Sequence, residues 1–273
     1  MSSSLATLNA KLAKSVRRFK LKLKSGRRGY EGYYATWEAA EALCRDSNPK
    51  IMIERVLSAR LKVMQGNAVY ERDSILFNEI QYSWPLATTL LWAAAKNGGK
   101  LHVLDFGGSL GSSYFQNIKF LSHLTQLSWS VVEQPSFVAA GKKHIENEVL
   151  KFYESVDEAV NAVSPDLILI SGSLQYIKDI GGLLAKVNSI SASVLLIDRT
   201  PVSNNSEHLI CVQQVSAEIY DAKHPIWVLS KEKLFGQLFN WQLISSFPAI
   251  DGPVKLGSGK KFEFTGLLFE RRV

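Results

Sequence analysis

The chain has 273 residues, of which 46% are hydrophobic and 21% charged, a composition that excludes a disordered or collagen-like protein. Its two cysteines, Cys44 and Cys211, lack the paired spacing of a zinc site, so we expect a reducing compartment and no bound metal. Residues 1–28 hold nine basic side chains and no acidic one, while the remainder carries 23 bases against 25 acids. A nearly neutral body argues against a nucleic-acid-binding surface.

The basic N-terminal segment, residues 1–28, has the pattern of an amphipathic helix. Apolar side chains recur every three or four positions, at Leu5, Leu8, Leu12, Val16, Phe19 and Leu23. This spacing places them on one helix face, as in helices that lie on anionic membranes. The same pattern fits a helix packed on its own domain, a solvated tail or an organelle transit peptide. We expect a cytoplasmic protein whose tail can contact the inner face of a membrane, and no apolar run is long enough for a membrane span.

Residues 29–98 are expected to form a helical cap. Thr36 is placed to cap a helix that begins at Trp37, and a second helix should follow Pro49. A third helix is predicted from near Asp73, with Pro85 kinking or dividing it. No strand is therefore expected in the cap.

Residues 99–273 alternate short β-rich runs with helical ones, which predicts one larger domain. The expected strands are 101–106, 128–133, 149–153, 166–171 and 193–198, with helices beginning near Gly111, Pro135, Ser155 and Asp179. Such alternation predicts an α/β fold with a Rossmann-like, doubly wound and mostly parallel sheet. The expected elements that follow are a polar loop at 201–207, a helical or irregular stretch to His224, a helix at 231–239, and an antiparallel strand pair at 241–247 and 262–269.

The glycine-containing turn after the first of these strands is the most informative stretch. In an open α/β sheet, this turn offers backbone N–H groups to a ligand. A dinucleotide frame that starts at Gly107 would need glycines where the chain has Ser109 and Ser112. With Asp105 two residues ahead, the run instead fits the Asp-x-Gly-x-Gly-x-Gly frame of class I S-adenosylmethionine-dependent methyltransferases, with Ser109 in place of the middle glycine and Gly111 as the last.

Two further strand ends fit the same cofactor. Glu133 ends the second strand, where a carboxylate can accept both ribose hydroxyls. The fourth strand ends in the small residues of 171–173, at the edge where ligands of doubly wound folds bind. The predicted cofactor-binding residues are Asp105, Gly107, Gly108, Gly111, Glu133, Gln134, Ser171, Gly172 and Ser173.

Several short runs extend the resemblance beyond the general fold. They are Tyr70–Asp73, Tyr82–Pro85, Leu104–Tyr114, Val132–Pro135, Leu174–Tyr176 and Ile197–Pro201. Together they resemble a family of methyltransferases associated with bacterial O-antigen and surface-polysaccharide synthesis, from about Tyr30 to the C-terminus. The resemblance implies a cytoplasmic bacterial enzyme that acts on sugars or on their lipid-linked precursors.

Methyl transfer to a hydroxyl requires a group that removes its proton. Asp198, at the end of the fifth strand, can act as base, acceptor-orienting group or metal ligand, or can form an ion pair with Arg199 that organises the next loop. His224 lies in an aromatic-rich run and is the preferred histidine base. The predicted substrate-binding residues are Arg72, Tyr82, Tyr176, Arg199, Tyr220 and Trp227.

The sequence thus favours a methyltransferase that uses S-adenosylmethionine to O-methylate a sugar-containing intermediate of cell-surface glycan synthesis. Two alternatives stay open. One is an NAD(P)-dependent sugar oxidoreductase or epimerase, and the other is an inactive, membrane-docked partner of a glycan assembly complex. The expected partner is a small-molecule or lipid-linked acceptor, and the sequence does not indicate an oligomeric state.

Overall fold

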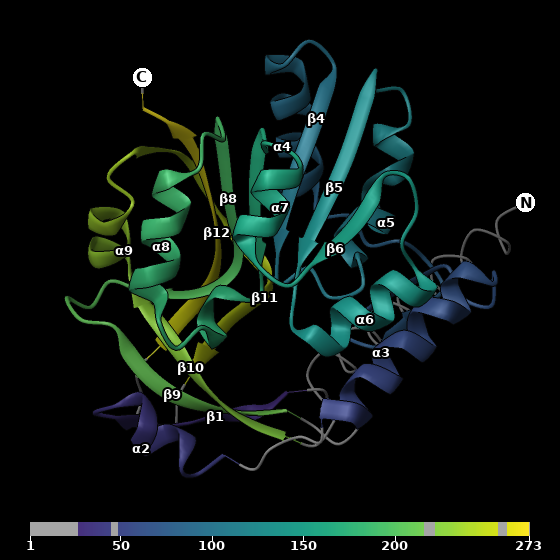
Figure 1. Ribbon diagram of the computed structural model, residues 1–273. Coiled ribbons are helices and arrows are strands. Elements are labelled where there is room, and N and C mark those ends of the chain that lie inside the picture. The colour runs from purple at the N-terminus through teal and green to yellow at the C-terminus, as the bar shows by residue number, and fades with distance from the viewer. Residues whose placement is uncertain (1–26, 45–48, 216–221, 256–260, 273) are drawn as a thin grey trace, which may run out of the picture.

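The structure analysed is a computed structural model that describes residues 27–44, 49–215, 222–255 and 261–272 (Figure 1). The predicted amphipathic helix over residues 1–26 and the candidate Tyr220 lie outside the described residues. Within these ranges, none of the helices combines the length and apolar character needed to cross a membrane.

The described elements alternate along most of the chain. The helices are α2 (Trp37–Glu41), α3 (Pro49–Met64), α4 (Trp84–Lys96), α5 (Ser112–Leu121), α6 (Pro135–His144), α7 (Val156–Ala162), α8 (Ile180–Ser189) and α9 (Lys231–Gln237), with a 3-10 turn η1 (Leu174–Tyr176). The strands are β1 (Arg27–Tyr34), β2 (Tyr70–Arg72), β3 (Ile75–Phe77), β4 (Lys100–Phe106), β5 (Gln126–Val132), β6 (Leu150–Tyr153), β7 (Leu167–Ser171), β8 (Val194–Ser203), β9 (Leu209–Val215), β10 (Ala222–Ser230), β11 (Trp241–Lys255) and β12 (Lys261–Arg271).

The core of the fold is a parallel sheet in the order β6-β5-β4-β7-β8. This is the 3-2-1-4-5 order of a doubly wound fold, in which the order reverses between β4 and β7. On the far side of β8, β12 pairs antiparallel and β11 pairs antiparallel with β12. The predicted Rossmann-like α/β fold with a C-terminal antiparallel strand pair is confirmed.

Helices cover both faces of this sheet because its strands are apolar on both sides. Along β8, Val194 and Leu196 pack into the core beneath α4, α5 and α6, whereas Leu195 and Ile197 pack beneath α7, α8 and α9. Helices α7 and α8 each begin where a side chain accepts a backbone N–H: the Ser155 Oγ accepts from Glu158 at 3.2 Å and the Asp179 Oδ1 accepts from Gly182 at 2.8 Å. The sequence predicted both of these helix starts.

The N-terminal region contains strands as well as helices, which corrects the expectation of a purely helical cap. The Thr36 cap of α2 and the helix after Pro49 are confirmed. However, β1 belongs to the main sheet, and β2 and β3 form a separate hairpin at the position where a third helix was expected to begin. Pro85 lies in the first turn of α4, where proline is tolerated, so it stands at the start of this helix and does not kink it.

The stretch after Asp198 is also more regular than the sequence indicated. β8 continues into the expected polar loop as far as Ser203, and the expected helical or irregular stretch contains β9 and the beginning of β10. β9 pairs antiparallel with both β1 and β10, and β10 meets β8 at Leu229 and Ser230. We call β1, β9 and β10 the antiparallel arm. It lies beyond the carboxyl ends of the parallel strands, as does α3 (Figure 1).

Candidate functional site

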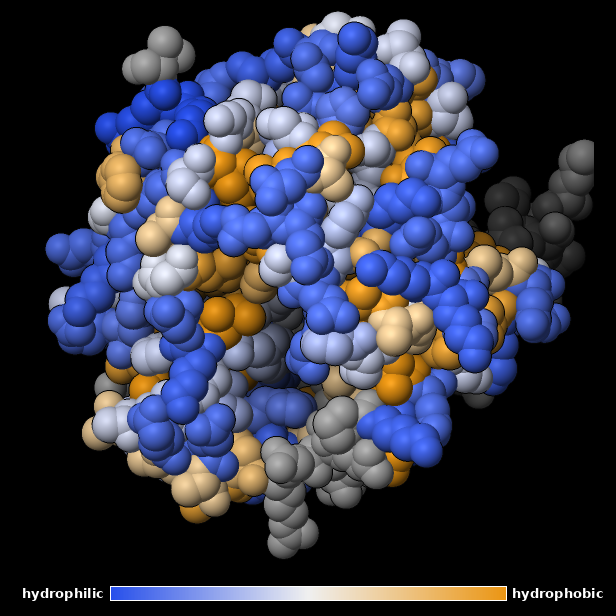
Figure 2. Space-filling model, viewed as in Figure 1, coloured by the Kyte–Doolittle hydropathy of each residue, from blue (hydrophilic) through white to orange (hydrophobic). Residues whose placement is uncertain are grey.

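A cavity of about 250 Å³ lies at the carboxyl ends of β4, β5 and β7, and we call it the glycine cavity. The space-filling view, drawn from the same side as Figure 1, shows a hollow near the middle of the molecule (Figure 2). Its walls come from the loop after β4, the ends of β5 and β7, α3 and β9, so segments far apart in the chain enclose it. This is the edge where doubly wound sheets bind their ligands.

The loop after β4 forms the floor of the glycine cavity with an unusual backbone. Gly107, Ser109 and Gly111 all have positive φ angles, of 70°, 55° and 79°. Ser109 therefore keeps the left-handed conformation for which glycine is best suited, and its replacement of the middle glycine leaves the loop path intact. At Gly108, a Cβ atom would lie 2.5 Å from the Asp105 Cγ, so only glycine fits there.

Asp105 is buried behind this loop, at 1% exposure. Its Oδ2 accepts a hydrogen bond from the Trp129 Nε1 at 2.9 Å. The pKa of Asp105 is raised to about 7, chiefly by burial; the Trp129 bond opposes this shift and the nearby Glu133 adds to it. The carboxyl group also lines the cavity, so it supports the loop and faces a ligand at once.

Glu133 follows β5 and is tied to the same loop. Its Oε1 accepts from the Ser109 backbone N–H at 3.1 Å and its Oε2 accepts from the Gln134 N–H at 2.9 Å. Burial raises the pKa of Glu133, whereas these two bonds lower it. Each oxygen keeps a further lone pair, so the carboxylate can also accept hydroxyl groups in the cavity.

The end of β7 supplies the wall opposite Glu133. Ser171 and Gly172 line the glycine cavity, as does Gln134 across from them. Ser173 instead donates from its Oγ to the Phe106 carbonyl at 2.8 Å, so it packs against the glycine loop and does not line the cavity. Gly111 also lies outside the lining and serves as the residue before α5.

A second cavity, of about 260 Å³, adjoins the first, and we call it the aromatic cavity. Tyr70, Tyr82, Trp84 and Phe247 contribute rings to its walls. Tyr82 and Trp84 contact each other with ring centroids 5.3 Å apart. The residues that line both cavities are Arg72, Ser112, Ser113, Ser171 and Arg199. A ligand in either cavity would therefore lie against the same short wall.

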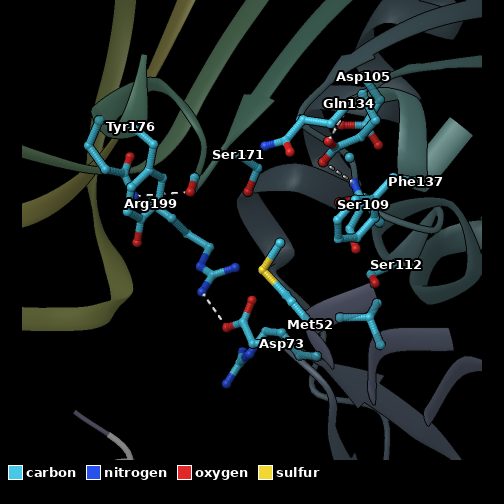
Figure 3. Close-up of a pocket in the computed structure, with 18 of the residues that line it drawn as sticks. Met52, Asp73, Asp105, Ser109, Ser112, Gln134, Phe137, Ser171, Tyr176 and Arg199 are labelled. Atoms are coloured by element: carbon cyan, nitrogen blue, oxygen red, sulfur yellow. Dashed lines mark hydrogen bonds and ion pairs between the residues drawn. The ribbon is translucent and has the colours of Figure 1, made fainter. Parts of the chain in front are cut away.

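Arg199 occupies this wall in a rigid ion-pair network. Its Nε lies 3.0 Å from the Asp251 Oδ2 and its Nη2 lies 3.0 Å from the Asp73 Oδ2, the second contact being drawn in Figure 3. Burial opposes the charge of Arg199, but the two carboxylates outweigh it and raise its pKa above the ordinary value. Its backbone has a φ of 53°, in the left-handed region that a residue with a side chain rarely adopts. The guanidinium of Arg199 is thus already paired with two carboxylates of the protein itself.

Asp198 precedes Arg199 and lines the aromatic cavity. Its Oδ1 accepts the backbone N–H of Arg199 at 2.8 Å, while the Arg199 guanidinium pairs with Asp73 and Asp251. The side-chain ion pair between Asp198 and Arg199 considered from the sequence is therefore not formed. Burial raises the pKa of Asp198, a shift that suits a carboxylate acting as a proton acceptor.

Three predicted residues lie on or beside the antiparallel arm. His224 and Trp227 were expected in an irregular segment over the site, but both belong to β10 and neither lines the two cavities. The Trp227 ring stacks on Trp37 at 5.4 Å and its Nε1 donates to a backbone carbonyl. Tyr176 does line the glycine cavity, and its hydroxyl donates to the Gln213 Oε1 at 2.6 Å. His224 forms a T-shaped ring contact with this tyrosine, with ring centroids 6.1 Å apart.

A buried polar cluster supports the glycine loop from behind. Arg60 and Glu71 form an ion pair, and both residues are fully buried. The Arg60 Nη2 donates to the Ser112 Oγ at 3.0 Å, and this hydroxyl in turn donates to Glu71. The guanidinium also lies 4.5 Å from the Phe115 ring centroid. The cluster joins α3, β2 and the start of α5.

Sequence reasoning missed several contributors because they come from distant segments. Met52 and Val56 of α3, Phe137 of α6 and Val215 of β9 line the glycine cavity. Asp251 of β11 lines it as well. Only the apolar face of α3 was visible as a pattern, and that pattern equally fits a buried helix. Over the described ranges, no group of three or more potential metal-binding side chains occurs.

Comparison with known proteins yields structural similarity alone. No family model matches the chain, and no curated protein matches it by sequence. The N-terminal domain of EvdMO1, solved with SAH and D-fucose, is 13% identical over 84% of this chain and 100% of that chain, with a TM-score of 0.48. The Burkholderia thailandensis 1,6-didemethyltoxoflavin-N1-methyltransferase is 13% identical over 84% of this chain and 92% of that chain, with a TM-score of 0.44.

A third similar structure is of a different enzyme. The [4+2]-cyclase SpnF is 10% identical over 81% of this chain and 95% of that chain, with a TM-score of 0.47. Similarity at this level assigns no reaction to the present chain. The function therefore has to be argued from the site itself.

Proposed function

We propose that the protein is an S-adenosylmethionine-dependent methyltransferase that holds its cofactor in the glycine cavity. The observation that carries this proposal is the bond between the Ser109 N–H and the Glu133 carboxylate. In a dinucleotide site, the N–H groups of this loop bind pyrophosphate. Here one of them already binds an anion, and Asp105 places a second carboxyl group beside the loop.

The residues of the cavity fit a cationic cofactor better than a nicotinamide dinucleotide. The ionised form of Asp105 would repel the phosphates of NAD(P) and attract an ammonium or sulfonium group, whereas Glu133 can accept the ribose hydroxyls of either cofactor. Gly108 lies where any Cβ atom would collide with Asp105, so the loop offers a bare backbone surface to a ligand. Glu133 would accept the ribose hydroxyls, and the wall formed by Gln134 and Phe137 lies beside it.

When bound, S-adenosylmethionine supplies a methyl group on a positively charged sulfur. The task of the chain is then to hold an acceptor oxygen in line with that group and to remove its proton. Asp198 lines the aromatic cavity next to the shared wall, and its raised pKa makes it a suitable base. His224 is the less suitable base because it lies behind Tyr176.

The proposed acceptor is a sugar-containing intermediate of cell-surface polysaccharide synthesis that is methylated on oxygen. The rings of Tyr82 and Trp84 at the aromatic cavity suit stacking against the apolar face of a sugar. A lipid-linked form of such an acceptor would place the protein in the cytoplasm at the membrane, as the basic N-terminal segment suggests.

The first test is calorimetric titration with S-adenosylmethionine, S-adenosylhomocysteine and NADH. We expect both adenosyl ligands to bind, and Glu133→Ala to weaken them at least tenfold, about 1.4 kcal/mol or more. Glu232→Ala, at an exposed acid of α9, is the matched control and should change nothing. Binding of NADH without either adenosyl ligand would replace the proposal with the oxidoreductase alternative.

The second test addresses Asp198, by incubating the protein with radiolabelled cofactor and a panel of nucleotide sugars and lipid-linked sugars. With an acceptor from this panel, Asp198→Asn should lower kcat on the order of 10²- to 10⁴-fold and leave cofactor affinity unchanged. It should also remove the acid limb of the kcat profile, which in the wild type should lie above the ordinary range of aspartate. An unchanged pH profile would remove Asp198 as the base.

A further inference from the structure

Arg72 is held at the junction of the two cavities by a tight hairpin. It is the last residue of β2, and the two residues that follow, Asp73 and Ser74, have φ angles of 52° and 65°. Two consecutive left-handed residues between paired strands form a type I′ turn, which fixes the strand ends closely. The Arg72 side chain lines both the glycine cavity and the aromatic cavity.

The guanidinium of Arg72 has donors to spare. An arginine carries five N–H donors and no acceptor. Among the described residues, no carboxylate lies within ion-pair distance of Arg72 and none of its donors forms a hydrogen bond. The contact of its guanidinium is with the Phe77 ring, at 5.6 Å from the centroid. Burial and the neighbouring Arg199 lower the pKa of Arg72, and the nearby Asp73 and Asp251 offset only part of this shift.

The two carboxylates that flank Arg72 in the sequence are engaged elsewhere, and Glu71 pairs with Arg60. Asp73 directly follows Arg72, yet its Oδ2 lies 3.0 Å from the Arg199 Nη2. Asp251, the other acid of this wall, binds Arg199 through both of its oxygens, at 3.0 and 3.4 Å. Arg199 thus takes two carboxylates and Arg72 takes neither.

We propose that Arg72 is the anion-binding residue of the site and takes a carboxylate group of a ligand at the junction of the cavities. A planar guanidinium with free donors matches a carboxylate in a bidentate arrangement. The inference rests on the proposed function, because it assumes that the two cavities hold cofactor and acceptor. Beyond the proposed function, it specifies that the ligand group recognised at the junction is negatively charged.

The carboxylate can come from either of two sources. S-adenosylmethionine carries one on its amino-acid end, which would reach Arg72 from the glycine cavity. An acidic acceptor, such as a uronate or a ring carboxylate, would reach it from the aromatic cavity. Arg72 would bind both carboxylates in the same way. The two sources can be distinguished by comparing each ligand with an analogue that lacks the carboxylate.

The experiment compares the full-length wild type with Arg72→Met, which removes the charge but keeps a long side chain. Lys119→Met, at an exposed cation of α5, is the matched control. Calorimetry first measures S-adenosylhomocysteine against 5′-methylthioadenosine, which lacks the amino-acid end. With S-adenosylhomocysteine saturating, the same proteins are then titrated with glucuronate against glucose, and with 4-hydroxybenzoate against 4-hydroxybenzyl alcohol.

A loss of at least tenfold in S-adenosylhomocysteine affinity, with 5′-methylthioadenosine unchanged, would confirm the proposal and assign the carboxylate to the cofactor. A similar loss confined to glucuronate or 4-hydroxybenzoate would confirm it and assign the carboxylate to the acceptor. Equal losses for charged and uncharged ligands would overturn it, since they indicate a distorted site. No change for any ligand would overturn it too, including the case where the wild type binds none of the acidic probes.

The proposed function is tested separately by Glu133→Ala. If the wild type binds S-adenosylhomocysteine and Glu133→Ala weakens it, the cofactor assignment stands whatever Arg72→Met does. If the wild type binds neither adenosyl ligand, the methyltransferase proposal fails first, and the proposal for Arg72 fails with it.

Discussion

At the scale of single residues, the burial of Asp105 makes the folded protein more stable when this carboxyl group is protonated than when it is ionised. The carboxyl group is buried next to Trp129, and its pKa of about 7 stands above the ordinary value of 3.8. Below about pH 4, the folded and unfolded chains both hold the proton. As the pH rises toward 7, only the unfolded chain releases it, so the folded state loses stability over this range.

This behaviour predicts a specific effect of Asp105→Asn. The amide can still accept from the Trp129 Nε1 but cannot ionise, so the variant should lack this pH dependence. Relative to it, the free energy of unfolding of the wild type should fall by up to about 4 kcal/mol between pH 4 and pH 8, from about 1.4 kcal/mol per pKa unit. Urea titrations at several pH values measure the difference, and parallel curves for the two proteins would contradict the pKa of Asp105.

The residue types in the glycine loop made this part of the site predictable. Gly107, Gly108 and Gly111 mark positions where a side chain is strained or collides, and those demands are visible in the sequence. The partners of Arg199 were not predictable in the same way. Asp73 and Asp251 lie far from it in the chain, and an acid next to it, Asp198, was an equally reasonable partner from spacing alone.

At the scale of elements, the Arg60–Glu71 pair connects α3 to β2 beneath the start of α5. Removing one member of a buried ion pair leaves the other charge without compensation, which costs about 3–5 kcal/mol. We therefore expect Glu71→Leu to lower the free energy of unfolding by about that amount. The double variant Arg60→Met/Glu71→Leu should recover most of the loss, because neither charge then remains buried.

Chemical denaturation of the two single variants and the double variant measures this cycle. A double variant as unstable as the sum of the single ones would show that the two side chains act independently. The cluster contacts Ser112 at the shared wall of the cavities, so cofactor affinity should fall along with stability in Glu71→Leu.

The parallel strands were predictable as elements, whereas the antiparallel arm was not. Strands such as β7 are buried on both faces and appear as short continuous apolar runs between turn residues. β10 contains Pro225, which argues against a strand in a sheet interior. Proline is tolerated there because Pro225 lies on an edge of the sheet. In the described part of the chain, β10 pairs with β9 along its length but with β8 only at Leu229 and Ser230, so no strand lies beside Pro225 on the side away from β9.

The hairpin of β2 and β3 was missed for a related reason. Two-residue hairpin turns are usually marked by Asn-Gly or Asp-Gly, whereas this chain has Asp73 and Ser74. With the turn unmarked, the surrounding residues resembled a continuing helix. Missing this hairpin matters for the site, because the hairpin places Arg72 at the junction of the two cavities.

At the scale of the whole molecule, cofactor binding should stabilise the fold against heat. The glycine cavity joins α3, the core strands and β9, so a ligand there contacts segments that must all be folded together. S-adenosylhomocysteine at about 100 times its Kd should add about 2.7 kcal/mol. At about 2–4 °C per kcal/mol, the expected rise in Tm is about 5–10 °C.

Differential scanning calorimetry of the wild type with and without S-adenosylhomocysteine measures this rise. With an affinity ten times lower, Glu133→Ala should show about half of this rise at the same ligand concentration, because the ligand then stands at about 10 times its Kd and adds about 1.4 kcal/mol. An equal rise in both proteins would place the ligand outside the glycine cavity.

The continuity of β8 has a consequence for how ligands enter and leave. Its ten residues pair with β7 and β12 in the core, and its last two pair with β10. The antiparallel arm therefore cannot swing open as a separate body without bending a strand of the central sheet. The hairpin of β2 and β3 pairs only with itself in the described chain, but the buried Arg60–Glu71 pair holds it to α3 and the Asp73–Arg199 pair holds it to β8. We therefore expect ligands to enter and leave the cavities without a hinge motion of the antiparallel arm.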